Sequence, residues 1–288
     1  MMISIVIPTY NRSDKLTSLL NSLVPQVRKN LLENSVEILV VDDHSQQAVV
    51  DRIRNLWDRD EYSFLKFFWL ERNRGPSFAR NYGLSRCTGE IIVFLDDDCI
   101  LEPNYVLETI RVHKEHPEAL VVNGNLKKLR DSYLSNFWFY NYNAAFNRKG
   151  CKFYRVNRLS SGNFSIKRTL LKKINPIFDQ SLPSREDYDL YLRFREKKID
   201  IYKSDDIVAH YDCRDSLVSF IKQRIWYSKG EYYLRKKHNL ELIIADQEAH
   251  RLDIRQDYPY LAILLGLVWR LSMKYWKLRD RVSKISPY

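Results

Sequence analysis

The chain has 288 residues, of which 45% are hydrophobic, so it is long enough to bury the core of one large domain or of a domain with an appendage. Its formal net charge of +11 favours an anionic partner, such as a nucleotide, a nucleic acid or an anionic membrane surface, without choosing among them. The four cysteines, at positions 87, 99, 151 and 213, have no CxxC spacing, which argues against a zinc site and a disulfide framework and favours free thiols in a reducing compartment.

Strands alternate with helices through the first part of the chain. Apolar and β-branched runs predict buried strands at Ile3–Ile7, Val36–Val41, Phe64–Leu70, Ile91–Leu95 and Ala119–Val122, with helices at 14–27, 48–57, 76–86 and 103–116. Continuous apolar strands joined by helices indicate an α/β fold with a parallel sheet that is covered on both faces. The opening segment, MMISIVIPTYNR, lacks the basic and apolar regions of a signal peptide, so we expect a cytoplasmic protein.

Polar residues follow the ends of four consecutive predicted strands. The segments are PTYNR (8–12), DDHS (42–45), ERNRG (71–75) and DDDC (96–99). Open α/β sheets bind their ligands at the carboxyl ends of the strands. The four segments therefore predict one shared binding site.

Three consecutive carboxylates, Asp96, Asp97 and Asp98, follow the apolar run IIVFL. Carboxylates this close repel one another unless a cation lies among them. In an extended segment Asp96 and Asp98 would point to one side and Asp97 to the other. Oxygen ligands of this kind suit Mg²⁺ or Mn²⁺, and Mg²⁺ binds through one or two carboxylates together with substrate phosphates. The alternative is a solvated acidic turn that caps the next helix.

The regular alternation ends in the second half of the chain. Residues 130–158 are rich in aromatic and polar residues without a clear period, and SSGNFSIKR (160–168) indicates a strand or turn that leads into a helix. Further elements are predicted as a helix at 186–197, short strands at 199–202 and 207–209, and a long helix at 216–237.

The tail, residues 258–285, is basic, amphipathic and contains tryptophan. Its apolar run Leu261–Trp269 is followed by Arg270 and Lys274, and is too short for a membrane-spanning helix, which needs about 20 apolar residues. Residues 250–288 include eight basic and three acidic residues. Such a helix could lie in a membrane interface, or it could pack on its own domain or on a partner subunit; both interpretations stay open.

Six segments together resemble the family-2 inverting glycosyltransferases of the GT-A fold. They are PTYNR (8–12), VVDDHS (40–45), ERNRGPSFARNYG (71–83), TGEIIVFLDDDCILEP (88–103), SSGNFSIKR (160–168) and REDYDLYLR (185–193). Each segment is weak alone, but their order and spacing match over residues 3–230. The resemblance implies a Rossmann-like, mostly parallel sheet in a GT-A domain at 1–240, with a nucleotide-sugar half at 1–125 and an acceptor half at 126–240, followed by a helical extension at 241–288.

The resemblance also implies which residues bind the nucleotide sugar. They are Pro8, Thr9, Tyr10, Arg12, Asp42, Asp43, Asn73, Gly75, Arg80, Asp96 and Asp97. Asp42 or Asp43 would hold the base or the ribose, although from the residues alone this pair would be read as a helix cap. His44 stands where the family usually has glycine. The resemblance does not fix the base, but a UDP-sugar is favoured.

The metal site and the catalytic base are implied in the same way. Asp96 and Asp98 would bind Mn²⁺ or Mg²⁺ as a DxD motif, and His210 matches a further histidine of the family, with a buried structural histidine as the alternative. Asp187 aligns with the base that removes the proton of the acceptor hydroxyl, and Glu186 would orient the site or the acceptor. From the residues alone both are N-terminal charges of a helix, and Asp189 is expected on the surface of that helix.

The acceptor is expected to be a saccharide or a lipid-linked saccharide, in surface polysaccharide or glycolipid assembly. The enzyme would then be cytoplasmic or peripheral on the inner face of the cell membrane, through residues 258–285, and a homodimer stays open. One alternative is a sugar-phosphate nucleotidyltransferase, but the first strand is followed by PTYNR and not by a glycine-rich loop. Another is a non-catalytic membrane-binding module, which has no need of the carboxylate clusters. Scattered basic residues without a known motif argue against nucleic acid.

Overall fold

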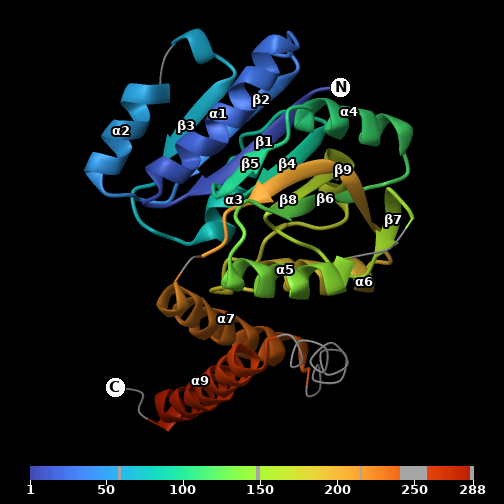
Figure 1. The fold of residues 1–288 in the computed structure, drawn as a ribbon. Coiled ribbons are helices and arrows are strands. Elements are labelled where there is room, and N and C mark those ends of the chain that lie inside the picture. The colour runs from blue at the N-terminus through green and yellow to red at the C-terminus, as the bar shows by residue number, and fades with distance from the viewer. Residues whose placement is uncertain (58–59, 147–149, 215, 241–257, 286–288) are drawn as a thin grey trace. The chain divides into compact units, whose positions relative to one another are not determined.

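The computed structural model describes residues 1–57, 60–146, 150–214, 216–240 and 258–285 (Figure 1). The chain divides into two compact units. The first, called here the sheet unit, comprises Met1–Leu129, Arg148–Gln180 and Asp187–Asp212, and the second, the helical unit, comprises Arg130–Asn147, Ser181–Glu186 and Cys213–Tyr288. Because each unit is assembled from separate segments, neither is one continuous stretch of sequence. The predicted domain boundary at residue 240 stays a prediction.

All strands of the sheet unit belong to one mixed sheet. Over the described residues the sheet has nine strands in the order β3-β2-β1-β4-β8-β6-β9-β5, with β7 also paired to β9. The bounds are β1 (Ile3–Thr9), β2 (Val36–Asp42), β3 (Leu65–Trp69), β4 (Ile91–Leu95), β5 (Cys99–Leu101), β6 (Val121–Lys128), β7 (Phe153–Val156), β8 (Asn163–Lys167) and β9 (Ile201–Tyr211). Strands β3, β2, β1 and β4 are parallel, so their carboxyl ends meet at one edge, as predicted. Strand β8 is antiparallel to both of its neighbours.

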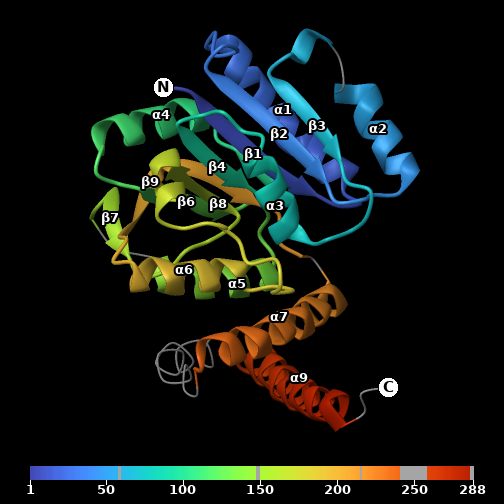
Figure 2. The same cartoon turned by 180° about the vertical axis from the view of Figure 1, so that it is seen from behind.

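Helices cover both faces of this sheet. Their bounds are α1 (Ser13–Lys29), α2 (Gln47–Trp57), α3 (Pro76–Leu84), α4 (Tyr105–Glu115) and α6 (Glu186–Glu196). Helices α1 and α4 lie on the face toward the viewer in Figure 1, and α3 and α6 lie on the opposite face, seen in Figure 2. The leucines that predicted α1 are fully buried, because they are spaced to form one side of the helix: Leu16, Leu19, Leu20 and Leu23. On the other face the rings of Phe94, Phe164 and Phe178 pack together, with centroids of Phe94 and Phe164 5.0 Å apart.

Two regions of the second half differ from the prediction. Residues 130–158, which show no clear period, contain α5 (Tyr133–Phe146) and β7. The two short strands expected at 199–202 and 207–209 are one strand, β9. Polar residues interrupt its apolar pattern, but β9 stays paired with β6 across an irregularity between Asn123 and Asn125, where buried Lys203 donates a hydrogen bond to Asn125 at 3.0 Å.

The helical unit contains α5, α7 (Leu217–His238) and α9 (Pro259–Ile285). Its core joins Phe137 of α5, Phe220 of α7, and Leu261 and Leu265 of α9. The tail helix predicted at 258–285 is therefore confirmed, with one side packed inside its own unit. Among the helices that the structure describes, none combines the length and apolar character needed to cross a membrane.

Candidate active site

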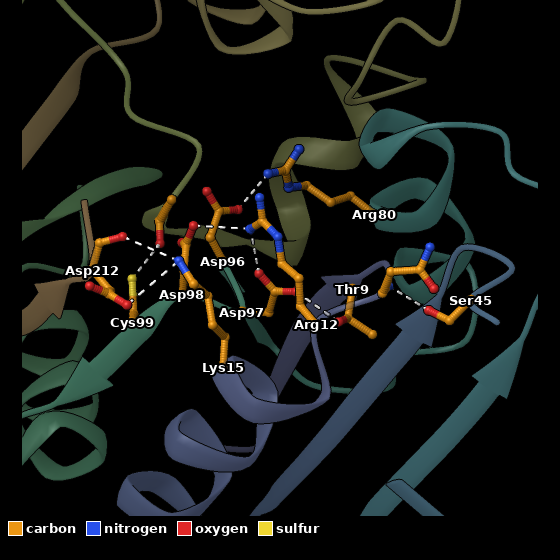
Figure 3. Close-up of polar contacts among 12 residues, drawn as sticks. Thr9, Arg12, Lys15, Ser45, Arg80, Asp96, Asp97, Asp98, Cys99 and Asp212 are labelled. Carbon is orange, nitrogen blue, oxygen red and sulfur yellow. Dashed lines mark hydrogen bonds and ion pairs between the residues drawn. The ribbon is translucent and has the colours of Figure 1, made fainter. Parts of the chain in front are cut away.

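The predicted site begins where β1 joins its two neighbours. Strand β1 lies between β2 and β4, and Thr9 at its end is paired in register with Asp42. The Thr9 hydroxyl donates a hydrogen bond to Asp97 Oδ2 at 2.7 Å (Figure 3). The backbone N–H of Asp43 donates to the Thr9 carbonyl at 2.9 Å. Buried Thr9 therefore ties together the polar segments that follow three strands.

The two aspartates after β2 hold different parts of the backbone. Asp42 accepts hydrogen bonds from the N–H and the hydroxyl of Ser45 at 2.7 and 2.5 Å. Asp43 accepts from the N–H groups of Arg74 and Gly75, both at 2.7 Å. Burial raises the pKa of Asp43, and these two N–H donors oppose the rise. Asp43 thus positions the loop before α3, which carries two of the predicted phosphate-side residues.

This loop depends on a glycine at its end. Gly75 has φ 85° and ψ 164°, a conformation that is open almost only to glycine, and it is the residue before Pro76 of α3. The side chain of Asn73 donates to the Asp43 carbonyl at 3.1 Å. Asn73, Gly75 and Asp43 therefore lie close together, and their role in binding the nucleotide sugar stays a prediction.

His44 has a left-handed backbone, with φ 69°. Glycine adopts this conformation without steric cost, and this explains why the family usually has glycine at this position. The His44 ring Nδ1 lies 3.2 Å from the Leu70 carbonyl, so the side chain of this chain's histidine contacts the backbone that follows β3.

The three aspartates after β4 are held by two arginines. Arg80 of α3 binds Asp96 at 2.6 Å, and Arg12 binds both Asp97 and Asp98 at 3.0 Å. Residues 97 and 98 form a turn and not an extended segment, so the expectation that Asp97 would point away from Asp98 is wrong. Both carboxylates reach the same guanidinium, as Figure 3 shows. The polar contacts place Asp96, Asp97 and Asp98 beside Arg12, Arg80 and Thr9.

The chemistry of this cluster fits a divalent cation. Asp98 Oδ1 is buried and has no hydrogen-bond partner among the described residues. Burial, followed by the negative charges of Asp97 and Asp96, raises the pKa of Asp98 to about 7. A bound cation would offset both the cost of burying the Asp98 carboxylate and its repulsion by Asp97 and Asp96. Over the described residues, no group of three or more His, Cys, Asp and Glu side chains is placed to hold a metal ion by itself. A cation here would be held by one or two of these carboxylates and would need further oxygen ligands, such as those of a substrate phosphate.

His210 lies on β9, which pairs with β5 directly after the aspartates, and Asp212 follows the end of β9. His210 is paired with Ile100, and its Nε2 atom lies 2.8 Å from Glu102 Oε1. Asp212 donates its backbone N–H to the Asp98 carbonyl at 2.9 Å, and its carboxylate lies 3.6 Å from Lys15 Nζ. The role of His210 as a metal ligand stays a prediction. Sequence reasoning missed Asp212 and Lys15, although Lys15 follows Arg12 by one helical turn and so faces the same way.

The predicted base lies at the start of α6. Asp187 is half-buried and accepts a hydrogen bond from the N–H of Tyr188 at 2.8 Å, and Glu186 beside it is buried. Asp189, expected on the helix surface, is instead fully buried. Its carboxylate is bound by Arg193 one turn later at 2.8 Å, and this ion pair makes its burial tolerable. The catalytic roles of Asp187 and Glu186 stay predictions.

A family model described as Glycosyl transferase family 2 matches residues 4–174. The chain belongs to this family. The resemblance seen in its motifs is thereby confirmed, and so is the expectation that the chain is a glycosyltransferase.

Curated glycosyltransferases that are similar to this chain support the same assignment. A dolichyl N-acetyl-α-D-glucosaminyl phosphate 3-β-D-2,3-diacetamido-2,3-dideoxy-β-D-glucuronosyltransferase of Methanococcus voltae is 23% identical over 244 residues, which are 82% of this chain and 74% of that protein. Three other curated glycosyltransferases are matched over only 36% to 58% of their own lengths.

Solved structures show that the family 2 chain has the GT-A fold. The mannosyltransferase PcManGT of Pyrobaculum calidifontis, in complex with GDP-Man and Mn²⁺, has a TM-score of 0.64 at 17% identity, over 99% of this chain and 81% of that chain. Staphylococcus aureus TarS 1–349, in complex with UDP-GlcNAc, has a TM-score of 0.57 at 21% identity, over 95% of this chain and 82% of that chain. The predicted α/β fold with flanking helices and a helical C-terminal region is confirmed.

Proposed function

We propose that this glycosyltransferase is metal-dependent and inverting, and that it moves a sugar from a nucleotide-diphosphate sugar to an acceptor hydroxyl. The observation that carries the proposal is the buried Asp98 oxygen without a hydrogen-bond partner among the described residues, next to two further carboxylates at the end of β4. In a family 2 chain this edge of the sheet is where a nucleotide would bind.

The donor would be bound by residues that the strands already hold in place. Asp43 fixes the loop of Asn73 and Gly75 through backbone hydrogen bonds, and this loop precedes the N-terminus of α3. Unpaired N–H groups at a helix N-terminus attract phosphate. Arg80, buried on α3 and bound to Asp96, adds positive charge on the same side. Thr9 keeps Asp97 close to the end of β1, where we place the ribose or the donor sugar.

Asp96 and Asp98 would hold Mn²⁺ or Mg²⁺, which when bound neutralises negative charge that develops on the departing diphosphate. Inverting transfer needs a second group, because the acceptor hydroxyl must lose its proton as it attacks the anomeric carbon. We assign that proton to the carboxylate of Asp187 and give Glu186 the task of orienting the base or the acceptor. His210 is retained as a candidate third ligand.

For the acceptor we propose a saccharide or a lipid-linked saccharide, and for the pathway surface polysaccharide or glycolipid assembly. The archaeal relative supports this choice, because its name gives a dolichyl phosphate-linked sugar as acceptor. The solved relatives contain UDP-GlcNAc or GDP-Man, and we propose a UDP-sugar as the donor. We also propose that the enzyme works at the inner face of the cell membrane as a peripheral protein.

Calorimetric titration with UDP, GDP and dTDP, with and without Mn²⁺, tests the proposal. We expect one nucleotide to bind in a manner that requires both Mn²⁺ and Asp98, so that D98A loses the metal-dependent binding. The matched control is D51A, which removes an exposed aspartate of α2 far from the aspartate triplet in sequence and should bind as the unchanged protein does. If nucleotide binding depends neither on Mn²⁺ nor on Asp98, the three aspartates form a structural turn and the proposed metal site is wrong.

A further inference from the structure

The helical unit carries an apolar stripe along α9 that is exposed. The α9 stripe consists of Tyr260, Leu264, Leu267, Leu271, Tyr275 and Leu278. Their exposed fractions run from 37% for Leu264 to 85% for Tyr260. Intervals of three or four residues place all six on one side of the helix, over a length of about 27 Å. Exposed apolar surface in a row of this kind marks a binding surface.

The fold of the helical unit does not use this stripe. A neighbouring side of α9 packs Leu261 and Leu265 into the core with Phe137 and Phe220. Further along, the indole N–H of Trp276 donates to the Ser228 hydroxyl of α7 at 3.3 Å. The packing of α9 within its unit is thus provided by residues outside the stripe, and polar substitutions in the stripe leave this packing in place.

Basic side chains run along one edge of the α9 stripe. At 100° per residue, Arg270, Lys274 and Lys277 fall beside the leucines, and all three are exposed. The only carboxylate in the sequence of α9 is Asp280, and it is bound to Lys236 of α7 at 3.0 Å. The exposed side of α9 therefore combines apolar and positively charged groups, and among its described residues it has no unpaired acidic side chain.

We propose that the α9 stripe binds the interface of an anionic lipid membrane, with α9 lying parallel to the bilayer surface. The leucines enter the boundary between headgroups and acyl chains, and the basic edge contacts lipid phosphates. The two tyrosines have an apolar ring and a polar tip, which suits the same depth. The inference deepens the location proposed above, and it is independent of the sugar transfer.

A second copy of the chain fits this surface less well than lipid does. Two copies packed stripe to stripe in an antiparallel arrangement would bring their basic edges close together, and like charges across an interface are repulsive. Anionic headgroups complement the same edge. Charge therefore favours lipid over self-association.

Vesicle flotation with the full chain tests the proposal. We expect binding to vesicles of phosphatidylcholine mixed with phosphatidylglycerol and much weaker binding to phosphatidylcholine alone. The variant L267Q/L271Q should weaken binding to the mixed vesicles at least about tenfold, since each leucine loses its apolar burial. K274Q/K277Q should weaken it roughly 30-fold, at about 1 kcal/mol per basic residue near the surface.

Matched variants of the sheet unit keep the test specific. L31Q changes a leucine that is 84% exposed, and K172Q/K173Q removes two exposed charges from the sheet unit. Both should bind vesicles as the unchanged chain does. If K172Q/K173Q weakens binding as much as K274Q/K277Q, net charge and not the α9 stripe is responsible, and the proposal fails.

Two further measurements separate the remaining outcomes. The first is light scattering. If the unchanged chain is a dimer, L267Q/L271Q is a monomer, and neither binds vesicles, then the α9 stripe binds a second copy of the chain and the proposal is overturned. Titration of L267Q/L271Q with nucleotide and Mn²⁺, without vesicles, should match the unchanged chain. If the unchanged chain binds no nucleotide, the proposed transferase site is rejected. If it binds nucleotide but no vesicles, the proposed membrane binding of the α9 stripe is rejected.

Discussion

Replacing Glu37 by glutamine should destabilise the sheet unit in a pH-dependent way. Glu37 lies in β2, is 2% exposed, and accepts hydrogen bonds from Ser4 at 2.6 Å, from Lys66 at 2.8 Å, and from the N–H and hydroxyl of Thr88 at 2.5 and 2.9 Å. Burial alone would raise its pKa, but these donors outweigh burial and lower the pKa from 4.5 to about 2. A shift of this size corresponds to at most about 3 kcal/mol of stability at neutral pH.

The sign of the effect follows from the lowered pKa. The pKa of Glu37 in the unfolded chain is taken as 4.5, so the stabilisation is complete above this pH. It is lost as the pH falls toward the folded-state pKa of about 2. Urea unfolding followed by circular dichroism should therefore show E37Q less stable than the unchanged chain by up to about 3 kcal/mol near pH 7, with a gap that narrows below pH ~4.5. The control is E115Q, which changes an exposed ion pair on α4 and should cost less than about 0.5 kcal/mol. Equal stability of E37Q and the unchanged chain at neutral pH, or a gap that stays constant with pH, would refute this reasoning.

Three other substitutions test the site and the packing beneath it. G75A should lower the stability measured by thermal unfolding by about 1 to 3 kcal/mol and should weaken nucleotide binding. The cause is the backbone, because alanine avoids the positive φ at which the N–H of residue 75 meets Asp43. It is not a clash, since the space around the new methyl is open to 4 Å. G83A should cost a similar amount for a different reason, since its methyl would lie 2.5 Å from Val6 Cγ1, and V6A in the same chain should recover part of the loss. D187N should lower kcat by about 10² to 10⁴ and leave nucleotide binding unchanged in calorimetry; equal loss of both would remove Asp187 from the role of base.

Much of the parallel half of the sheet could be predicted from the sequence. Strands buried on both faces are written as uninterrupted apolar runs, so β1, β2 and β4 were predicted to within two residues at each end. Strand β9 is different, because Ser204, Asp205 and Asp206 stand in its middle, and its pairing with β6 overrides the local pattern. Helix α5 lacks a period because buried aromatic residues occur at both Phe137 and Phe139, which do not share one side of a helix.

The candidate site was predictable in its place but not in its contacts. Polar residues that follow neighbouring parallel strands lie at the same edge of the sheet, the one formed by the carboxyl ends of the strands. Which arginine meets which carboxylate depends on the turn at 97–98 and on where the first turn of α1 lies, and neither is encoded in a local pattern. The burial of Asp189 was unpredictable for the same reason, since its partner Arg193 makes burial tolerable only in the folded helix.

The position of Arg12 gives the carboxylate cluster a positive charge that comes from within the chain. The side chains of Asp97 and Asp98 are largely buried together, and their mutual repulsion is partly offset by a guanidinium that the chain itself supplies, 3.0 Å from each. Newly made protein can therefore close this end of the sheet before any divalent ion arrives. If Asp98 binds a divalent ion as proposed above, that ion would have to compete with Arg12 for the carboxylate, and the arginine would then set a concentration below which the cluster stays in its ion-paired form.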